Sequence, residues 1–265
     1  MGKHSKQSKI FKNVNYKNEE NILDHSRRKR KMPFSQKCLL FIFTITFIIS
    51  GIILLKWYIN TGDSEKTYKE LAKNVIEIKE EKSSSPIDFD KLKETNSDVV
   101  AWIKIDGTTI DYPVMQKSDN SYYLTKNFYN ENDRTGSIFL DYKNKKDFTD
   151  KNTVIYGHNI KRGTMFADLV DIYNGTFGDN IEINIYTPSK LLKFKVFSSY
   201  SVEPEDYGIN TSIMEKDFNS FKQTLIQKSE RKFKDVLNGS NQILTLSTCD
   251  RTGRKRVLVH AELMN

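Results

Sequence analysis

Residues 38–55 form an uncharged, strongly apolar run of 18 residues, CLLFIFTITFIISGIILL. As an α-helix this run would be roughly 27 Å long at 1.5 Å per residue, close to the ~30 Å hydrocarbon core of a bilayer. Trp57 and Tyr58 follow it, where aromatic side chains are enriched at a membrane surface. The run therefore predicts a membrane-spanning signal anchor over residues 38–58, and it divides the chain into a short tail and a long C-terminal part.

A cleaved signal peptide is the alternative interpretation of this run. Signal peptides usually have a shorter apolar region of ~7–15 residues and a small-residue cleavage site after it. The sequence KWYINTGDS that follows the run has no such site. An uncleaved anchor is therefore favoured.

The positive charge of the chain lies before the predicted span. The net charge is +8, and residues 1–37 hold 11 Lys or Arg against 3 Asp or Glu, whereas the remaining residues hold 31 of each sign. By the positive-inside rule the basic tail is cytoplasmic and residues 60–265 are extracellular. Because the outer part is neutral, it lacks the basic surface that a nucleic acid would require, and no nucleic acid is expected as a partner.

The segment after the span has helical periodicity. Apolar residues recur among lysines and glutamates at Tyr68, Leu71, Val75 and Ile78. This spacing predicts an amphipathic helix over residues 64–82, which the sequence SSSP then ends. We interpret residues 59–86 as a helical stalk and linker whose apolar stripe packs on the following domain, rather than as a binding site for a partner. The globular domain is then 87–265.

The pattern within residues 87–265 is mainly β. Eight short runs are rich in β-branched and aromatic residues: 99–105, 109–115, 137–142, 152–158, 180–186, 190–202, 242–248 and 256–263. Because helices do not alternate with them, these runs predict a closed or nearly closed barrel with mostly antiparallel strands. Asp106-Gly107 is typical of a hairpin between the first two. A few helices are expected near 88–96, 164–174 and 213–229, the last inserted between two strands.

The two cysteines of the chain, Cys38 and Cys249, fall on opposite sides of the predicted membrane and so cannot pair. An unpaired thiol in an extracellular domain is normally lost, buried or used. Cys249 follows the strand-like sequence TLST, where a turn would expose its side chain to a cleft. A cysteine becomes an effective nucleophile only beside a cation or a base. The alternative is that Cys249 is a small buried apolar residue.

Three residues of the outer domain could be partners for that thiol. His158 ends a predicted strand beside Gly157, and a titratable group at the mouth of a barrel can face a groove. Arg256 begins the strand after Cys249, so it returns close to the thiol if the two strands are neighbours. Its guanidinium is a poor base but a good donor to a developing oxyanion. His260 lies inside an alternating apolar strand and is interpreted as structural.

The sequences TLSTC (245–249) and YGHN (156–159), together with Arg256 in KRVLVHAEL, resemble the signature of sortases. These are membrane-anchored cysteine transpeptidases of Gram-positive bacteria. The inserted helix before TLSTC and the run DYPVMQKSDNSYYLTKNF resemble class B members of that family. The resemblance covers roughly residues 88–263 and implies an eight-stranded sortase-type β-barrel with a few peripheral helices.

The resemblance also implies roles for individual residues. Cys249 would attack the carbonyl of a threonine in an NPxTN-like C-terminal sorting signal and form a thioester. His158 would act as acid and then base, and Arg256 would hold the oxyanion. Residues that line the peptide site in the family match Asn120, Leu124 and Ser247. The acidic loops with which class A members bind calcium have no counterpart here, so neither a metal nor another cofactor is expected.

The expected partners follow from the same resemblance: the cell membrane, secreted surface proteins that carry a sorting signal, and the amine of a peptidoglycan precursor or cross-bridge. A membrane tether would raise the effective concentration of the enzyme near both substrates. Two other functions fit the same residues. A papain-like surface hydrolase would use water in place of the amine, and in a non-catalytic adhesion module Cys249 would be incidental.

Overall fold

The computed structural model describes residues 33–75, 85–160, 163–204, 209–234, 240–249 and 252–264, with the side chains of 56–65 left out. The chain divides into two compact units, residues 1–57 and 58–265. Most of the predicted basic tail and Ile78 of the predicted stalk lie outside the described residues.

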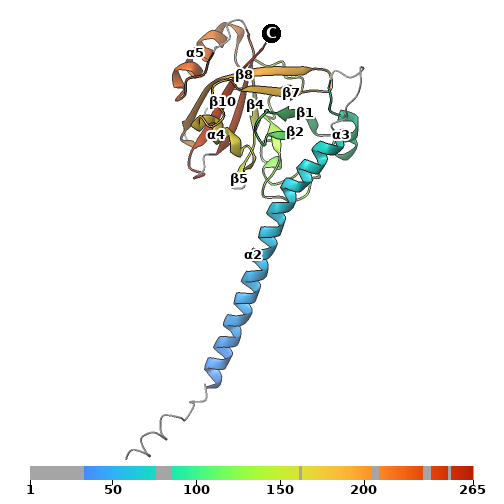
Figure 1. Ribbon diagram of the computed structural model, residues 1–265, viewed down its shortest axis with the longest axis vertical. Coiled ribbons are helices and arrows are strands. Elements are labelled where there is room, and N and C mark those ends of the chain that lie inside the picture. The colour runs from blue at the N-terminus through green and yellow to red at the C-terminus, as the bar shows by residue number, and fades with distance from the viewer. Residues whose placement is uncertain are drawn as a thin grey trace, which may run out of the picture. The chain divides into compact units, whose positions relative to one another are not determined.

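The helix α2 runs without interruption over Phe34–Val75 (Figure 1). Its first 22 residues, Phe34–Leu55, have a mean hydropathy of 2.8 and are long and apolar enough to cross a membrane. No residue of their most apolar stretch is buried. The amphipathic helix predicted over 64–82 is helical over its described residues 64–75, but it does not begin at 64, because it continues from the apolar helix. Proline, the residue that would break a helix, is missing from the sequence between them.

Eight strands of the second unit form a closed barrel in the order β1-β2-β3-β4-β9-β10-β8-β7 (Figure 1). Their bounds are β1 Val99–Lys104, β2 Asp111–Met115, β3 Ile138–Leu140, β4 Asn152–Tyr156, β7 Glu182–Tyr186, β8 Leu191–Val202, β9 Ile243–Cys249 and β10 Arg256–Leu263. Each corresponds to one predicted run, so the predicted barrel is confirmed. The pairs β2–β3 and β4–β9 are parallel and the other pairs antiparallel.

Short helices and a small hairpin are the other regular elements among the described residues of this unit. The helical elements are α3 Phe89–Thr95, η1 Tyr122–Leu124, α4 Ala167–Asn174, η3 Glu215–Asp217 and α5 Phe218–Lys228. The Asp88 carboxylate caps α3 by accepting from the Lys91 N–H. The two-stranded hairpin of β5 (Asn159–Ile160) and β6 (Thr164–Met165) was not predicted. Its strands are two residues long, too short for a periodic pattern.

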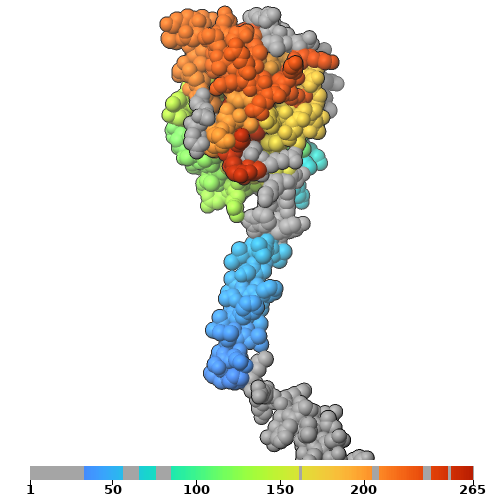
Figure 2. All heavy atoms as spheres, turned by 90° about the vertical axis from the view of Figure 1, so that its left-hand side faces the viewer, coloured from blue at the N-terminus to red at the C-terminus, as the bar shows by residue number. Residues whose placement is uncertain are grey.

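The predicted stripe of the stalk packs as expected, since Tyr68, Leu71 and Val75 are buried in the main core of the second unit. A smaller apolar cluster lies under α5, where Phe218 and Leu225 pack with Phe197 and Tyr200 of β8. Figure 2 shows the α5 region as the orange surface at the top of that view. Its position between β8 and β9 in the chain confirms the predicted helical insertion.

Candidate active site

One pocket of about 220 Å³ gathers all six residues proposed from the sequence. The residues that line it are Asn120, Leu124, Phe139, Tyr156, Gly157, His158, Ser247, Cys249 and Arg256. They come from η1 and the segment before it, from β3, β4, β9 and β10, and from the connection after β4. Phe139, Tyr156 and Gly157 are additions to the predicted set. Tyr156 was visible in the YGHN sequence but carried no chemistry that singled it out.

Cys249 and Arg256 are register partners across the antiparallel pair β9–β10. The Arg256 Nη1 donates to the Cys249 Sγ at 2.6 Å. The Cys249 side chain is half-buried and not in a disulfide. The Asn159 side-chain amide holds the Cys249 backbone by donating to its carbonyl oxygen at 3.0 Å. The thiol therefore lies at the pocket surface beside a permanent cation, and it is not the sealed apolar residue of the alternative interpretation.

His158 reaches the same end of the barrel because β4 and β9 run parallel. Tyr156 is the register partner of Ser247, so residues 158 and 249 each lie two positions beyond a paired position. The predicted strand 152–158 is two residues too long, and His158 lies in the connection between β4 and β5. In this connection the Gly157 N–H still donates to the Ser247 carbonyl oxygen at 3.1 Å. A side chain would not fit at position 157, because an added Cβ would lie 2.4 Å from the Ile138 side chain.

The His158 ring is oriented by a backbone carbonyl. Its Nε2 lies 2.9 Å from the Leu124 carbonyl oxygen. A carbonyl oxygen can only accept, so this contact places a proton on Nε2 and leaves the lone pair on Nδ1. The ring is therefore held in one tautomer, in which Nδ1 is the nitrogen available to exchange a proton.

The Asn120 side chain is held in a single orientation by residues 141 and 142, which follow β3. Its Nδ2 donates to Asp141 Oδ2 at 2.9 Å, and its Oδ1 accepts from the Tyr142 N–H at 3.0 Å. The same Asp141 oxygen accepts from the Tyr156 hydroxyl at 2.8 Å. Because Oδ1 already has a partner, the remaining hydrogen of the Asn120 amide is suited to donate to a ligand carbonyl. Asp141, buried at the edge of the site, was not singled out from the sequence.

His260 is part of the interior and not of the pocket. It is buried, its Nδ1 lies 2.9 Å from Thr245 Oγ1, and its ring stacks on Tyr200 at 5.2 Å. Burial, with a smaller contribution from the Lys228 cation, lowers the pKa of His260 to about 3. The ring is therefore neutral at working pH, which confirms its structural interpretation.

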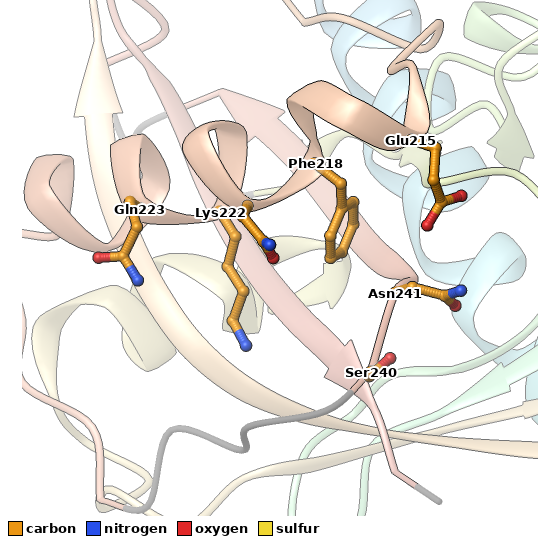
Figure 3. A pocket seen from close by; sticks show the side chains of 7 residues that line it. Glu215, Phe218, Lys222, Gln223, Ser240 and Asn241 are labelled. Atoms are coloured by element: carbon orange, nitrogen blue, oxygen red, sulfur yellow. The ribbon is translucent and has the colours of Figure 1, made fainter.

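A larger hollow of about 390 Å³ lies beside α5 (Figure 3). It is lined by Glu215, Phe218, Asn219, Lys222, Gln223, Ser240 and Asn241, which include neither a cysteine nor a histidine. Among the described residues, no group of three or more His, Cys, Asp or Glu side chains is arranged to hold a metal ion. The smaller pocket with Cys249 is thus the better candidate for chemistry, although the hollow beside α5 has more volume.

The barrel agrees with comparisons to known proteins. The family model of the sortase domain matches residues 103–264. The chain belongs to the sortase family, whose members are cysteine transpeptidases. Its relatives are more particularly class B sortases. Sortase B of Listeria monocytogenes is 41% identical over 167 residues, which cover 60% of this chain and 65% of that protein.

Two further relatives cover more of the chain. Sortase B of Staphylococcus aureus is 32% identical over 237 residues, covering 84% of this chain and 94% of that protein. The crystal structure of sortase B from Bacillus anthracis in complex with AAEK1 superimposes with a TM-score of 0.68 at 32% identity, covering 78% of this chain and 99% of that one. The chain therefore shares both sequence and fold with class B sortases.

Proposed function

We propose that this chain is a membrane-anchored transpeptidase that cleaves an NPxTN-like C-terminal sorting signal after its threonine and transfers the protein to a cell-wall amine. The observation that carries the proposal is the 2.6 Å contact between Arg256 Nη1 and Cys249 Sγ in a pocket that His158 also lines. Membership of the sortase family and the apolar part of α2 support it.

The proposed reaction begins from the form in which the Cys249 thiol has given its proton to His158 Nδ1. The resulting Cys249 thiolate attacks the threonine carbonyl carbon. Arg256, which is always charged, stabilises the negative charge first on sulfur and then on the tetrahedral oxyanion. When the intermediate collapses, the carbon–nitrogen bond breaks and the leaving amine takes a proton from His158. The product is a thioester between the threonine and Cys249.

The second half of the reaction reverses these roles. The acceptor amine attacks the thioester carbonyl and gives a proton to the His158 imidazole. The carbon–sulfur bond breaks, a new amide bond forms, and the thiolate is regenerated beside Arg256. The Leu124 carbonyl keeps Nε2 protonated, so Nδ1 is the nitrogen that carries the transferred proton in both halves.

The peptide would bind along the remaining wall of the pocket. Asn120 offers an N–H to a backbone carbonyl, Leu124 offers apolar surface, and Ser247 lines the floor beside the thiol. In the proposed topology the tail before α2 is cytoplasmic and the barrel is extracellular, where secreted proteins and peptidoglycan amines are found. The site needs neither a metal nor a cofactor for this chemistry.

The test is incubation of the full chain in detergent with an NPxTN-like peptide, with and without an amine such as oligoglycine or a diaminopimelate-containing fragment. We expect a new amide product whose yield rises with amine concentration. Hydrolysis that no amine alters would favour the surface hydrolase instead. No cleavage, with Cys249→Ala indistinguishable from the unaltered chain, would favour the adhesion module.

A further inference from the structure

The hydroxyl of Tyr68 links α2 to two points of the connection between η1 and β3. Tyr68 is 4% exposed. Its oxygen accepts from the Phe128 N–H at 3.1 Å and lies 3.2 Å from Ser137 Oγ and 3.3 Å from the Gly136 carbonyl oxygen. Because Ser137 Oγ donates its own proton to the Lys126 carbonyl at 2.8 Å, Tyr68 is the donor towards residues 136–137. One phenol therefore joins the middle and the end of this connection.

The end of this connection lies beside the His158 ring. Gly136 has φ +60°, and a Cβ added there would lie 2.6 Å from the Tyr123 carbonyl, 2.9 Å from the Leu124 carbonyl and 3.1 Å from His158 Cδ2. The Ser137 N–H donates to the Tyr123 carbonyl at 2.9 Å. The turn that Tyr68 holds is thus packed directly against the His158 ring and against the carbonyl that orients it.

A second set of contacts leads from Tyr68 to the backbone of His158. The ring of Tyr68 packs edge-to-face on Tyr112, with centroids 5.4 Å apart. The Tyr112 hydroxyl accepts from the Met165 N–H at 3.1 Å, and the next residue, Phe166, donates its N–H to the His158 carbonyl at 2.9 Å. Tyr68 therefore supports both the ring and the main chain of His158.

We propose that Tyr68 is a positioning residue for His158, so that the helix preceding the barrel is part of the catalytic apparatus. This inference rests on the proposed function, in which His158 exchanges protons with the substrate. Burial raises the pKa of Tyr68 to about 12, so its hydroxyl keeps the proton that it donates. A shift of about 1 Å at a catalytic group can reduce rate by ~10²-fold even when its cause is remote.

The test is Tyr68→Phe in the full chain in detergent, which removes the hydroxyl and keeps the buried ring. We expect kcat to fall about tenfold while KM changes less than twofold, because the peptide-binding residues Asn120 and Ser247 make none of these contacts with Tyr68. The spectroscopic readout is the ¹⁵N NMR signal of the His158 ring at high pH, where we expect a smaller population of the Nε2–H tautomer.

Three further variants separate positioning from stability. Ser137→Ala removes one of the two acceptors of the Tyr68 proton and leaves the Gly136 carbonyl, so it is expected to lower kcat in the same direction but by less. Adding it to Tyr68→Phe should cause no additional loss. Leu71→Ala weakens the same helix through apolar packing alone, and Tyr200→Phe alters a buried tyrosine that packs on His260 instead. Both are expected to keep kcat and the His158 signal of the folded enzyme.

The proposal is overturned if Tyr68→Phe leaves kcat and the His158 signal unchanged. It is equally overturned if Leu71→Ala, at the same loss of stability, reproduces both changes, because the hydroxyl would then have no specific part. The NMR readout needs no turnover, so it judges Tyr68 even if the peptide assay shows that the proposed transpeptidation is wrong.

Discussion

Arg256 and Cys249 face each other across β9 and β10, with Nη1 2.6 Å from Sγ. A connection of six residues separates them in the chain, so the hairpin alone brings the cation to the thiol. Because the guanidinium is planar and carries several donors, it can hold the sulfur and a substrate oxygen at the same time. This arrangement makes the identity of the cation, and not only its charge, important for the reaction.

Arg256→Lys is expected to lower kcat by about 10²–10³-fold, since an ammonium cannot reproduce the fork of donors. The measurement is single-turnover cleavage of a sorting peptide. Arg254→Lys is the matched control, because Arg254 is exposed in the same connection and bonds to Thr252. Activity within a few-fold of the unaltered enzyme would remove Arg256 from the mechanism.

Cys249→Ala is expected to abolish the covalent intermediate, because no other group in the pocket is a thiol. The enzyme is incubated with the peptide, the reaction is quenched, and the protein is examined by mass spectrometry. The unaltered chain should show the mass of the acyl adduct and the variant should not. Cys38→Ala should form the adduct normally, since Cys38 lies in the apolar part of α2. An adduct that persists in Cys249→Ala would assign the nucleophile elsewhere.

His158→Gln tests proton transfer separately from ring placement. Glutamine can still donate to the Leu124 carbonyl, as Nε2 does at 2.9 Å, but it cannot exchange a proton at neutral pH. We expect at least ~10²-fold loss of kcat with a folded, peptide-binding protein, measured by turnover together with peptide affinity. Retained turnover would show that another group supplies the proton.

Gly136→Ala should reduce activity more than its loss of stability explains. Any side chain at φ +60° is strained by roughly 1–2 kcal/mol, and here the Cβ would also press on the Leu124 carbonyl and the His158 ring. Gly107→Ala is the control, because Gly107 has φ +80° with open space around it. The measurements are the melting temperature and kcat of both variants. We expect both variants to melt at a lower temperature, but only Gly136→Ala to have a lower kcat.

The buried His260 should make stability depend on pH. Its pKa is lowered to about 3 in the folded protein, whereas the unfolded chain takes up the proton near pH 6.5. The unfolded state therefore binds more protons between these values, and the free energy of unfolding falls by about 1.4 kcal/mol per pH unit as pH drops through this window. Above pH 6.5 His260 is neutral in both states, so its contribution to stability is fully present and no longer changes with pH.

Urea unfolding at pH 7 and pH 5 of the unaltered chain and of His260→Asn measures this contribution. We expect the variant to be less stable at pH 7 but to lose about 2 kcal/mol less on going to pH 5. Equal losses in the two proteins would mean that His260 can be protonated in the folded state. Turnover of the folded variant should persist, since His260 is not in the pocket.

Much of the fold could be predicted because its determinants are local. The apolar run before Lys56 and the eight β-rich runs each depend on residues close together in the chain. The apolar run is part of helix α2, and each of the eight β-rich runs corresponds to a strand of the barrel. The candidate thiol, imidazole and guanidinium were also recognisable, because Cys249 and Arg256 lie on adjacent strands of one hairpin and His158 follows a strand end.

The tertiary structure alone decided how distant segments meet. The parallel pairing of β4 with β9 sets the level of His158 against Cys249, and register in a closed sheet depends on every other strand. The Leu124 carbonyl accepts from His158 Nε2 and so fixes the tautomer of the ring. Tyr68 bonds to Gly136 beside that ring from a helix more than fifty residues earlier in the chain. Such contacts leave no periodic trace in the sequence, because a single hydrogen bond between remote residues depends on the folded path of the whole chain and not on the pattern of its neighbours.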